Sequence, residues 1–332
     1  MRARLAAVAA GIVVVAVLPR VMSNYHAYQF AFVGIYFIAL TGLNLLTGYS
    51  GQISLGHGAF MGLGAYTTAI LTVNHGWRDL WTIPLAGLVA GVAGYLFGLP
   101  ALRLAGVYLA LATFALPISI ASLEKHFRGF TGGGTGIIMH LPKVELGLHT
   151  NPSRWLYYLT WSIAAVLFAA AWLLVRGRTG RALRSLHNSE VAAAASGVNI
   201  AAFKTFAFGV SAFYAGVAGS LLAIAVAFVN PDTFPISLSI LLLTGVVVAG
   251  LGRLSGLLFG ALFIEFVPLY AQNISKQAPS VVYGLVLIGL LLIIPTGAAG
   301  LLASTLRLLR GRSYSRQGNG VAALAPTPKE RT

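Results

Sequence analysis

Long apolar segments alternate with short polar connections along most of this 332-residue chain. Each segment approaches the ~20 residues that a helix needs to cross a bilayer, about twice the length that a transmembrane strand needs. The pattern predicts an all-α fold, a polytopic transmembrane helical bundle of about ten spans. These spans start near Leu5, Ala27, Gln52, Trp81, Leu104, Trp155, Thr205, Ile236, Ser255 and Ser280.

The two ends of the chain differ from this pattern. The first apolar segment follows Arg2 and Arg4 and resembles a signal peptide, but it lacks a convincing small-residue cleavage site. We therefore predict an uncleaved first span. Residues 1–302 are predicted to form the transmembrane domain. The remaining residues, 303–332, are predicted to form a basic, disordered cytoplasmic tail rich in Gly, Ser, Pro and charge.

Composition supports a membrane protein. The chain is 58% hydrophobic and only 9% charged, against about 25% charged residues in a typical soluble domain. This excludes an ordinary soluble enzyme, a nucleic-acid binder and a disordered chain. The net charge is +15, and most basic residues fall in alternate loops. Because cytoplasmic loops carry an excess of Lys and Arg, both termini are predicted to lie in the cytoplasm.

Glycine is expected to break or tighten several helices. The chain has 39 glycines, and residues 51–73 are the least regular apolar segment, for which a full crossing and a re-entrant segment both stay open. Small residues also let membrane helices pack closely, and we favour that role for the Gly-x-x-x-Gly pairs. These pairs are Gly58 and Gly62, Gly87 and Gly91, Gly94 and Gly98, and Gly256 and Gly260.

Some polar residues lie at predicted membrane depth, where they must find partners or line a pathway. Asn44, Gln52, Ser54 and His57 are therefore candidates for a translocation path, with helix packing as the alternative. Glu265 is the only acid inside a predicted span. It is either functional or a neutral, hydrogen-bonded group at a helix interface.

The basic segment 176–204 is predicted to be a cytoplasmic loop containing a short helix at about 189–196. Asn188 or Ser189 can cap this helix, Glu190 suits its first turn, and Gly197 can end it. Such a helix can dock into a groove on a cytoplasmic partner. The alternative is a linker that only fixes the membrane orientation.

The sequence lacks the signatures of several chemistries. The glycine run that starts at Thr131 does not end in the Gly-Lys-Ser/Thr of a phosphate-binding loop. There is no cysteine, the histidines lack metal-ligand spacing, and no Ser-His-Asp or paired-carboxylate site is evident. We therefore predict no catalytic residues, no metal site and no cofactor bound by this chain. Any energy coupling comes from a partner or an ion gradient.

Six segments in order resemble LivM-type permeases, which belong to the ABC uptake systems for branched-chain amino acids. The first contains the run Tyr-Ser-Gly-Gln-Ile-Ser-Leu-Gly-His, and together the segments extend over about 40–300. They are 42–66, 103–116, 131–137, 178–223, 230–234 and 246–262.

The resemblance implies an importer subunit of the bacterial inner membrane that translocates Leu, Ile or Val by alternating access. It implies a homologous LivH-like permease, two cytoplasmic ATPases that use ATP and Mg²⁺, and a periplasmic or surface binding protein as partners. Nucleic acid is not implied. It also adds Thr113 to the path candidates. The resemblance implies docking to an ATPase for the loop 176–204, and we predict Gly180, Arg181, Arg184, Glu190, Gly197 and Lys204 as its coupling residues.

Two segments depart from the family pattern. The Thr-Gly-Gly loop continues with Gly134 and Thr135 instead of a polar-acidic pair. Glu190 and Gly197 are seven positions apart, whereas the Glu-Ala-Ala motif of other ABC importers has a spacing of six. Alternative functions are the same importer class with urea, amide or aromatic-acid cargo, or an ion-coupled secondary transporter. A single membrane acid argues against ion coupling.

Overall fold

A computed structural model describes residues 18–19, 22–104, 106–140, 151–274, 279–293 and 297–300. The predicted first span and the predicted tail lie outside these residues. The main helices are α2 (Asn24–Leu43), α3 (His57–His75), α4 (Asp79–Ala101), α5 (Val107–His126), α7 (Pro152–Arg176), α8 (Arg178–Asn188), α9 (Glu190–Ala195), α10 (Ile200–Val226), α11 (Ile236–Ala249), α12 (Leu257–Ile274) and α13 (Pro279–Ile293). The shorter elements are the π-helical turn η1 (Asn44–Tyr49), α6 (Arg128–Thr131), the 3-10 turns η2 (Gly133–Thr135), η3 (Pro231–Thr233) and η4 (Leu254–Gly256), and the strands β1 (Ile137–Ile138) and β2 (Phe228–Val229).

Seven segments of the described chain are long and apolar enough to cross a membrane, judged by length and composition. They coincide with seven of the predicted spans. Two further predicted spans correspond to α3, with 19 residues, and α13, with 15 residues, which are not among the seven. The prediction of a polytopic helical membrane protein is confirmed, but the count of about ten spans is not.

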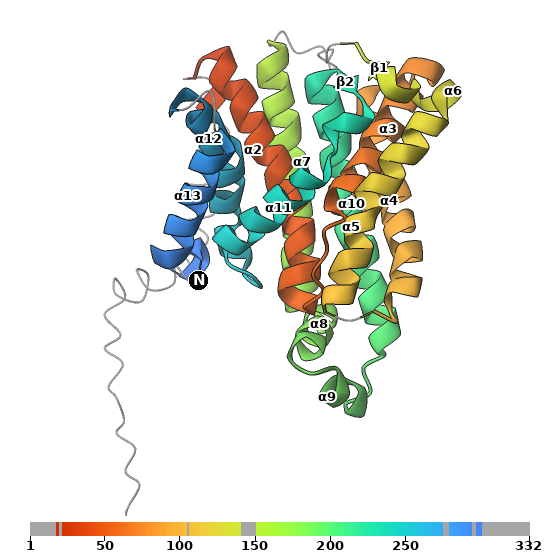
Figure 1. The fold of residues 1–332 in the computed structure, drawn as a ribbon, viewed down its shortest axis with the longest axis vertical. Helices are drawn as coiled ribbons and strands as arrows, with labels where there is room; N and C mark the ends of the chain where they lie inside the picture. The colour runs from red at the N-terminus through yellow and green to blue at the C-terminus, as the bar shows by residue number, and fades with distance from the viewer. Residues whose placement is uncertain are drawn as a thin grey trace, which may run out of the picture.

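The long helix α10 forms the centre of the bundle and packs against α4, α3 and α2 (Figure 1). Four glycines of α4 face it at helical spacing, and a Cβ atom on any of them would approach α10 atoms. Gly64 of α3 and Gly216 of α10 also meet backbone to backbone. These approaches support the packing role predicted for the glycine pairs, because small residues allow helix axes to come close. The four glycines of α4 are Gly87, Gly91, Gly94 and Gly98.

The predicted irregular segment is a real break in the helices. After η1, residues 51–56 leave the helical conformation, and α3 begins only at His57. The predicted start near Gln52 is therefore wrong by five residues. Gly51 has φ of 75°, a left-handed conformation that an α-helix does not accommodate. Figure 1 shows this connection rising from the lower end of α2 to the start of α3 inside the bundle.

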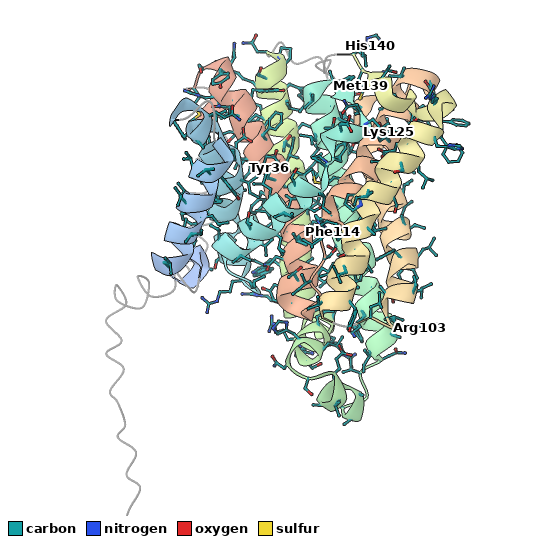
Figure 2. All side chains as sticks on the ribbon, in the orientation of Figure 1. Tyr36, Arg103, Phe114, Lys125, Met139 and His140 are labelled. Atoms are coloured by element: carbon teal, nitrogen blue, oxygen red, sulfur yellow. The ribbon has the colours of Figure 1, made fainter. Side chains whose placement is uncertain are left out.

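The bundle has two distinct ends. The α8–α9 hairpin projects from one end, and the antiparallel pair of β1 and β2 lies at the other (Figure 1). This strand pair joins Ile137 to Val229 and was not predicted. Figure 2 places Arg103 near the hairpin end and Lys125 and His140 near the strand end. The hairpin carries the dense basic segment that was predicted to be cytoplasmic.

Candidate functional site

Three helices surround the start of α3. His57 Nε2 lies 3.1 Å from the Ala39 carbonyl oxygen of α2, and His57 is buried. The Leu55 N–H donates to Thr113 Oγ1 of α5 over 2.9 Å. The Gly58 N–H donates to Ser239 Oγ of α11, also over 2.9 Å. These bonds bring His57 and Thr113, two path candidates, to the same break in the bundle.

Gln52 and Ser54 shape the break itself. The side-chain Nε2 of Gln52 donates to Ser50 Oγ over 2.8 Å. The backbone carbonyl of Gln52 accepts from Thr47 Oγ1 over 3.2 Å. Ser54 Oγ accepts from the Gly56 N–H over 3.3 Å. Both side chains are buried, so these local hydrogen bonds stabilise a backbone that has left the helical pattern.

Asn44 and Glu265 lie elsewhere in the bundle. Asn44 is fully buried; its Nδ2 donates to the Arg253 carbonyl over 3.2 Å, and its Oδ1 accepts from the Gly252 N–H over 3.0 Å. It braces the turn before η4. Glu265 lies on α12, which packs against α2, and its side chain is partly buried. It therefore occupies a helix interface, and a role in the path stays a prediction for both residues.

The basic segment is more helical than predicted. The short helix is present as α9, and Ser189 caps it by accepting the Ala192 N–H over 3.3 Å. Gly197 ends the turn with φ of 78°. However, the residues before Ser189 form the additional helix α8 rather than a loop. The buried residues of α8, Gly180, Leu183 and Leu186, recur at helical spacing. The arginines between them made this apolar face difficult to recognise in the sequence.

Several predicted coupling residues hold this hairpin against the bundle. Lys204 Nζ of α10 pairs with Glu190 Oε1 of α9 over 2.6 Å, and the lysine is buried. Arg184 Nη2 donates to the Val175 carbonyl over 3.0 Å. Gly180 packs directly against that carbonyl, where a larger side chain would collide. Arg181 is exposed at the surface of α8.

A polar cavity of about 110 Å³ joins the break to the hairpin. A Cβ atom added to Gly51 would lie 2.7 Å from His187 Nδ1. Helix α8 therefore packs directly against the break. The Arg184 guanidinium also lies 5.5 Å from the ring of Tyr49, the last residue of η1. A displacement of the hairpin therefore acts directly on the break. The cavity is lined by Ser50, Gly51, Gln52, Leu104, Gly106, Leu109, Leu186, His187, Glu190 and Lys204.

Sequence reasoning missed Glu124. Glu265 was taken as the only acid inside a span, but Glu124 lies inside α5, within the candidate span Val107–His126, and is only 8% exposed. The buried residues of α5 are Leu109, Thr113, Pro117 and Glu124. Their helical spacing is the signal that would have placed Glu124 on the inner face.

The sequence comparisons agree with each other. Residues 25–295 match the family model described as branched-chain amino acid transport system / permease component. The chain is 31% identical over 310 residues to two proteins named high-affinity branched-chain amino acid transport system permease protein LivM. These come from Escherichia coli K12 and Salmonella typhimurium LT2, and the match covers 85% of this chain and 72% of each relative.

A more distant relative is the ribose import permease protein RbsC of Haemophilus influenzae. It is 33% identical over 111 residues, which covers 31% of this chain and 34% of the relative. No solved structure matches the chain. In the described part of the chain, no group of three or more His, Asp or Glu side chains is placed to hold a metal ion.

Proposed function

The chain belongs to the family of permease components of branched-chain amino acid transport systems, and we propose that it imports leucine, isoleucine and valine as the membrane-spanning subunit of an ATP-driven importer. Two relatives that cover most of the chain carry this cargo in their names. The seven apolar segments fit a transport subunit of the bacterial inner membrane.

One observation carries the proposal: the polar cavity between the break at residues 50–52 and the α8–α9 hairpin. An importer driven from the cytoplasm needs a contact that converts motion outside the membrane into motion inside it. The hairpin touches the irregular part of the bundle at Gly51, in addition to its contacts with α7 and α10. An irregular segment can change shape without breaking a ladder of helical hydrogen bonds.

The mechanism follows from this contact. Two cytoplasmic ATPase subunits, using ATP and Mg²⁺, bind the hairpin and move it when their dimer closes. The movement shifts His187 against Gly51. It thereby rearranges residues 51–56, which connect η1 to the start of α3. The break sits beside His57 and Thr113, so the central path turns from one side of the membrane to the other. This chain contributes no nucleotide site of its own.

The remaining partners are a homologous LivH-like permease, which completes the path, and a periplasmic or surface binding protein, which selects the cargo. Strong binding inside the path would slow release, so selectivity belongs to the binding protein. Importers of urea, amides or aromatic acids share this design, and cargo is therefore the finer part of the proposal.

Uptake of labelled leucine into proteoliposomes tests the proposal. The vesicles contain this chain, its partner permease and both ATPases, with the binding protein outside and ATP inside. We expect accumulation that requires both ATP and binding protein and is blocked by excess isoleucine or valine but not by urea. Binding-protein-stimulated ATP hydrolysis without leucine uptake would refute the cargo. Uptake that ignores ATP would refute the importer class.

A further inference from the structure

Among the buried polar atoms of the described residues that lack hydrogen-bond partners, two belong to neighbouring helices near the strand end of the bundle. They are Oε1 of Glu124 on α5 and the hydroxyl oxygen of Tyr66 on α3. Glu124 is 8% exposed and Tyr66 is 4% exposed. Buried polar groups in proteins are nearly always paired, and an acid inside a membrane span is costly and usually functional. The unpaired atoms therefore require an explanation.

Both atoms lie on the same side of α3. A Cβ atom added to Gly62 would lie 3.5 Å from Glu124 Oε1, and Tyr66 is one helical turn further along α3. Gly58, on the same face one turn before Gly62, bonds Ser239 at the break. The pair thus lies on the helix face that leads from the strand end toward the break.

The basic residue next to Glu124 in the sequence already has an ion-pair partner. Lys125 follows Glu124 directly but extends to the surface, where its Nζ pairs with Asp232 over 3.1 Å. Thr131, which also contacts Glu124, donates to its backbone carbonyl rather than to the carboxylate. In its ionised form the carboxylate only accepts hydrogen bonds, so a cargo that brings donors would satisfy it. An ammonium group supplies several donors and the opposite charge.

We propose that Glu124 and Tyr66 form a transient subsite for the ammonium group of an amino-acid cargo entering from the strand end of the bundle. This inference rests on the proposed function. Gly62 puts no side chain beside the acid, and Glu124 Oε1 and the Phe234 ring both lie 3.5 Å from the point where a Cβ atom of residue 62 would stand. Carboxylate and aromatic wall together suit a solute with an ammonium group and an apolar side chain.

The test is leucine uptake by the complete importer carrying Glu124→Gln. The amide keeps the shape of the side chain and removes its charge, so a merely structural acid tolerates the change. We expect uptake to fall at least about tenfold, the effect of one charged hydrogen bond, while binding-protein-stimulated ATP hydrolysis persists. Asp232→Asn, which removes a carboxylate from the exposed ion pair at the same end, is expected to transport normally.

A second variant covers failure of the first to assemble. Tyr66→Phe removes only the hydroxyl, and we expect uptake to fall about threefold through a weaker neutral hydrogen bond. Normal uptake in Glu124→Gln overturns the inference, and so does normal uptake in Tyr66→Phe if the first variant does not assemble. A wild-type importer without ATP-dependent leucine uptake refutes the proposed function separately.

Discussion

At the scale of single residues, the buried polar side chains divide into those with complete hydrogen bonds and those without. Asn44, Gln52 and His57 have partners in the backbone or in neighbouring side chains. Glu124 and Tyr66 have buried atoms that lack one. Gln52 and His57 therefore stabilise the break, and Asn44 stabilises the turn before η4. Because an incomplete set of hydrogen bonds is costly, an unpaired atom would gain most from a bound solute.

Asn44→Ala tests the bracing role. It leaves the Arg253 carbonyl and the Gly252 N–H without their side-chain partner, which costs about 1–3 kcal/mol. We expect a lower Tm of the purified protein in detergent. Asn74→Ala, at an exposed asparagine of α3, is the control and should change stability by less than about 0.5 kcal/mol. Equal Tm values for the two variants would contradict the bracing role.

The sequence predicted residues whose role is local. The Ser189 cap and the left-handed Gly197 follow from the chemistry of neighbouring residues, and both are confirmed. The environment of Glu124 depends on where α5 ends relative to Gly62 of α3. That is a tertiary relation, and the adjacent Lys125 made the position resemble the start of a polar loop.

At the scale of elements, the contact between α8 and the break is the part of the site that sequence could not supply. The broken helix after Gly51 and the short helix α9 were both predicted from local signals. The contact between the break and the hairpin was not predicted, because residues 51 and 187 are far apart in the chain. Nor was α8 predicted, since the residues before Ser189 were interpreted as part of a basic cytoplasmic loop.

Gly51→Ala tests this contact, with Gly76→Ala as its matched control. Both glycines have positive φ, so both substitutions carry a backbone strain of about 1–2 kcal/mol. Only the Gly51 variant pushes a methyl group against His187, because nothing lies within 4 Å of the Gly76 position. We expect a several-fold loss of binding-protein-stimulated ATP hydrolysis in proteoliposomes for Gly51→Ala alone. A similar loss in both variants would show that strain, not contact, matters.

At the scale of the whole molecule, hydropathy predicted the helical bundle well, because each span must satisfy its own backbone in lipid. The count of spans is harder to predict, since α3 and α13 are shorter or more polar than the other crossing helices. The orientation comes from charge, and the α8–α9 hairpin carries the dense cluster of arginines.

The orientation can be measured with single cysteines, since the natural chain has none. Ser196→Cys lies on the exposed turn after α9, and His140→Cys lies near the strand end (Figure 2). A membrane-impermeant maleimide added to spheroplasts should label His140→Cys at once and Ser196→Cys only after permeabilisation. The reverse pattern would invert the orientation and remove the hairpin from the cytoplasm.

The close packing of the central helix α10 has a consequence for the leakage of solutes across the membrane. The helix starts beside the hairpin, carries Lys204 near that end, and runs about 40 Å to the residue before β2. The glycine contacts with α4 and α3 leave no room for it to bend or slide independently. We therefore expect it to act as a stiff rod between the hairpin end and the strand end. A push at the hairpin end then reaches the strand end, so we expect the proposed path to open toward one end at a time.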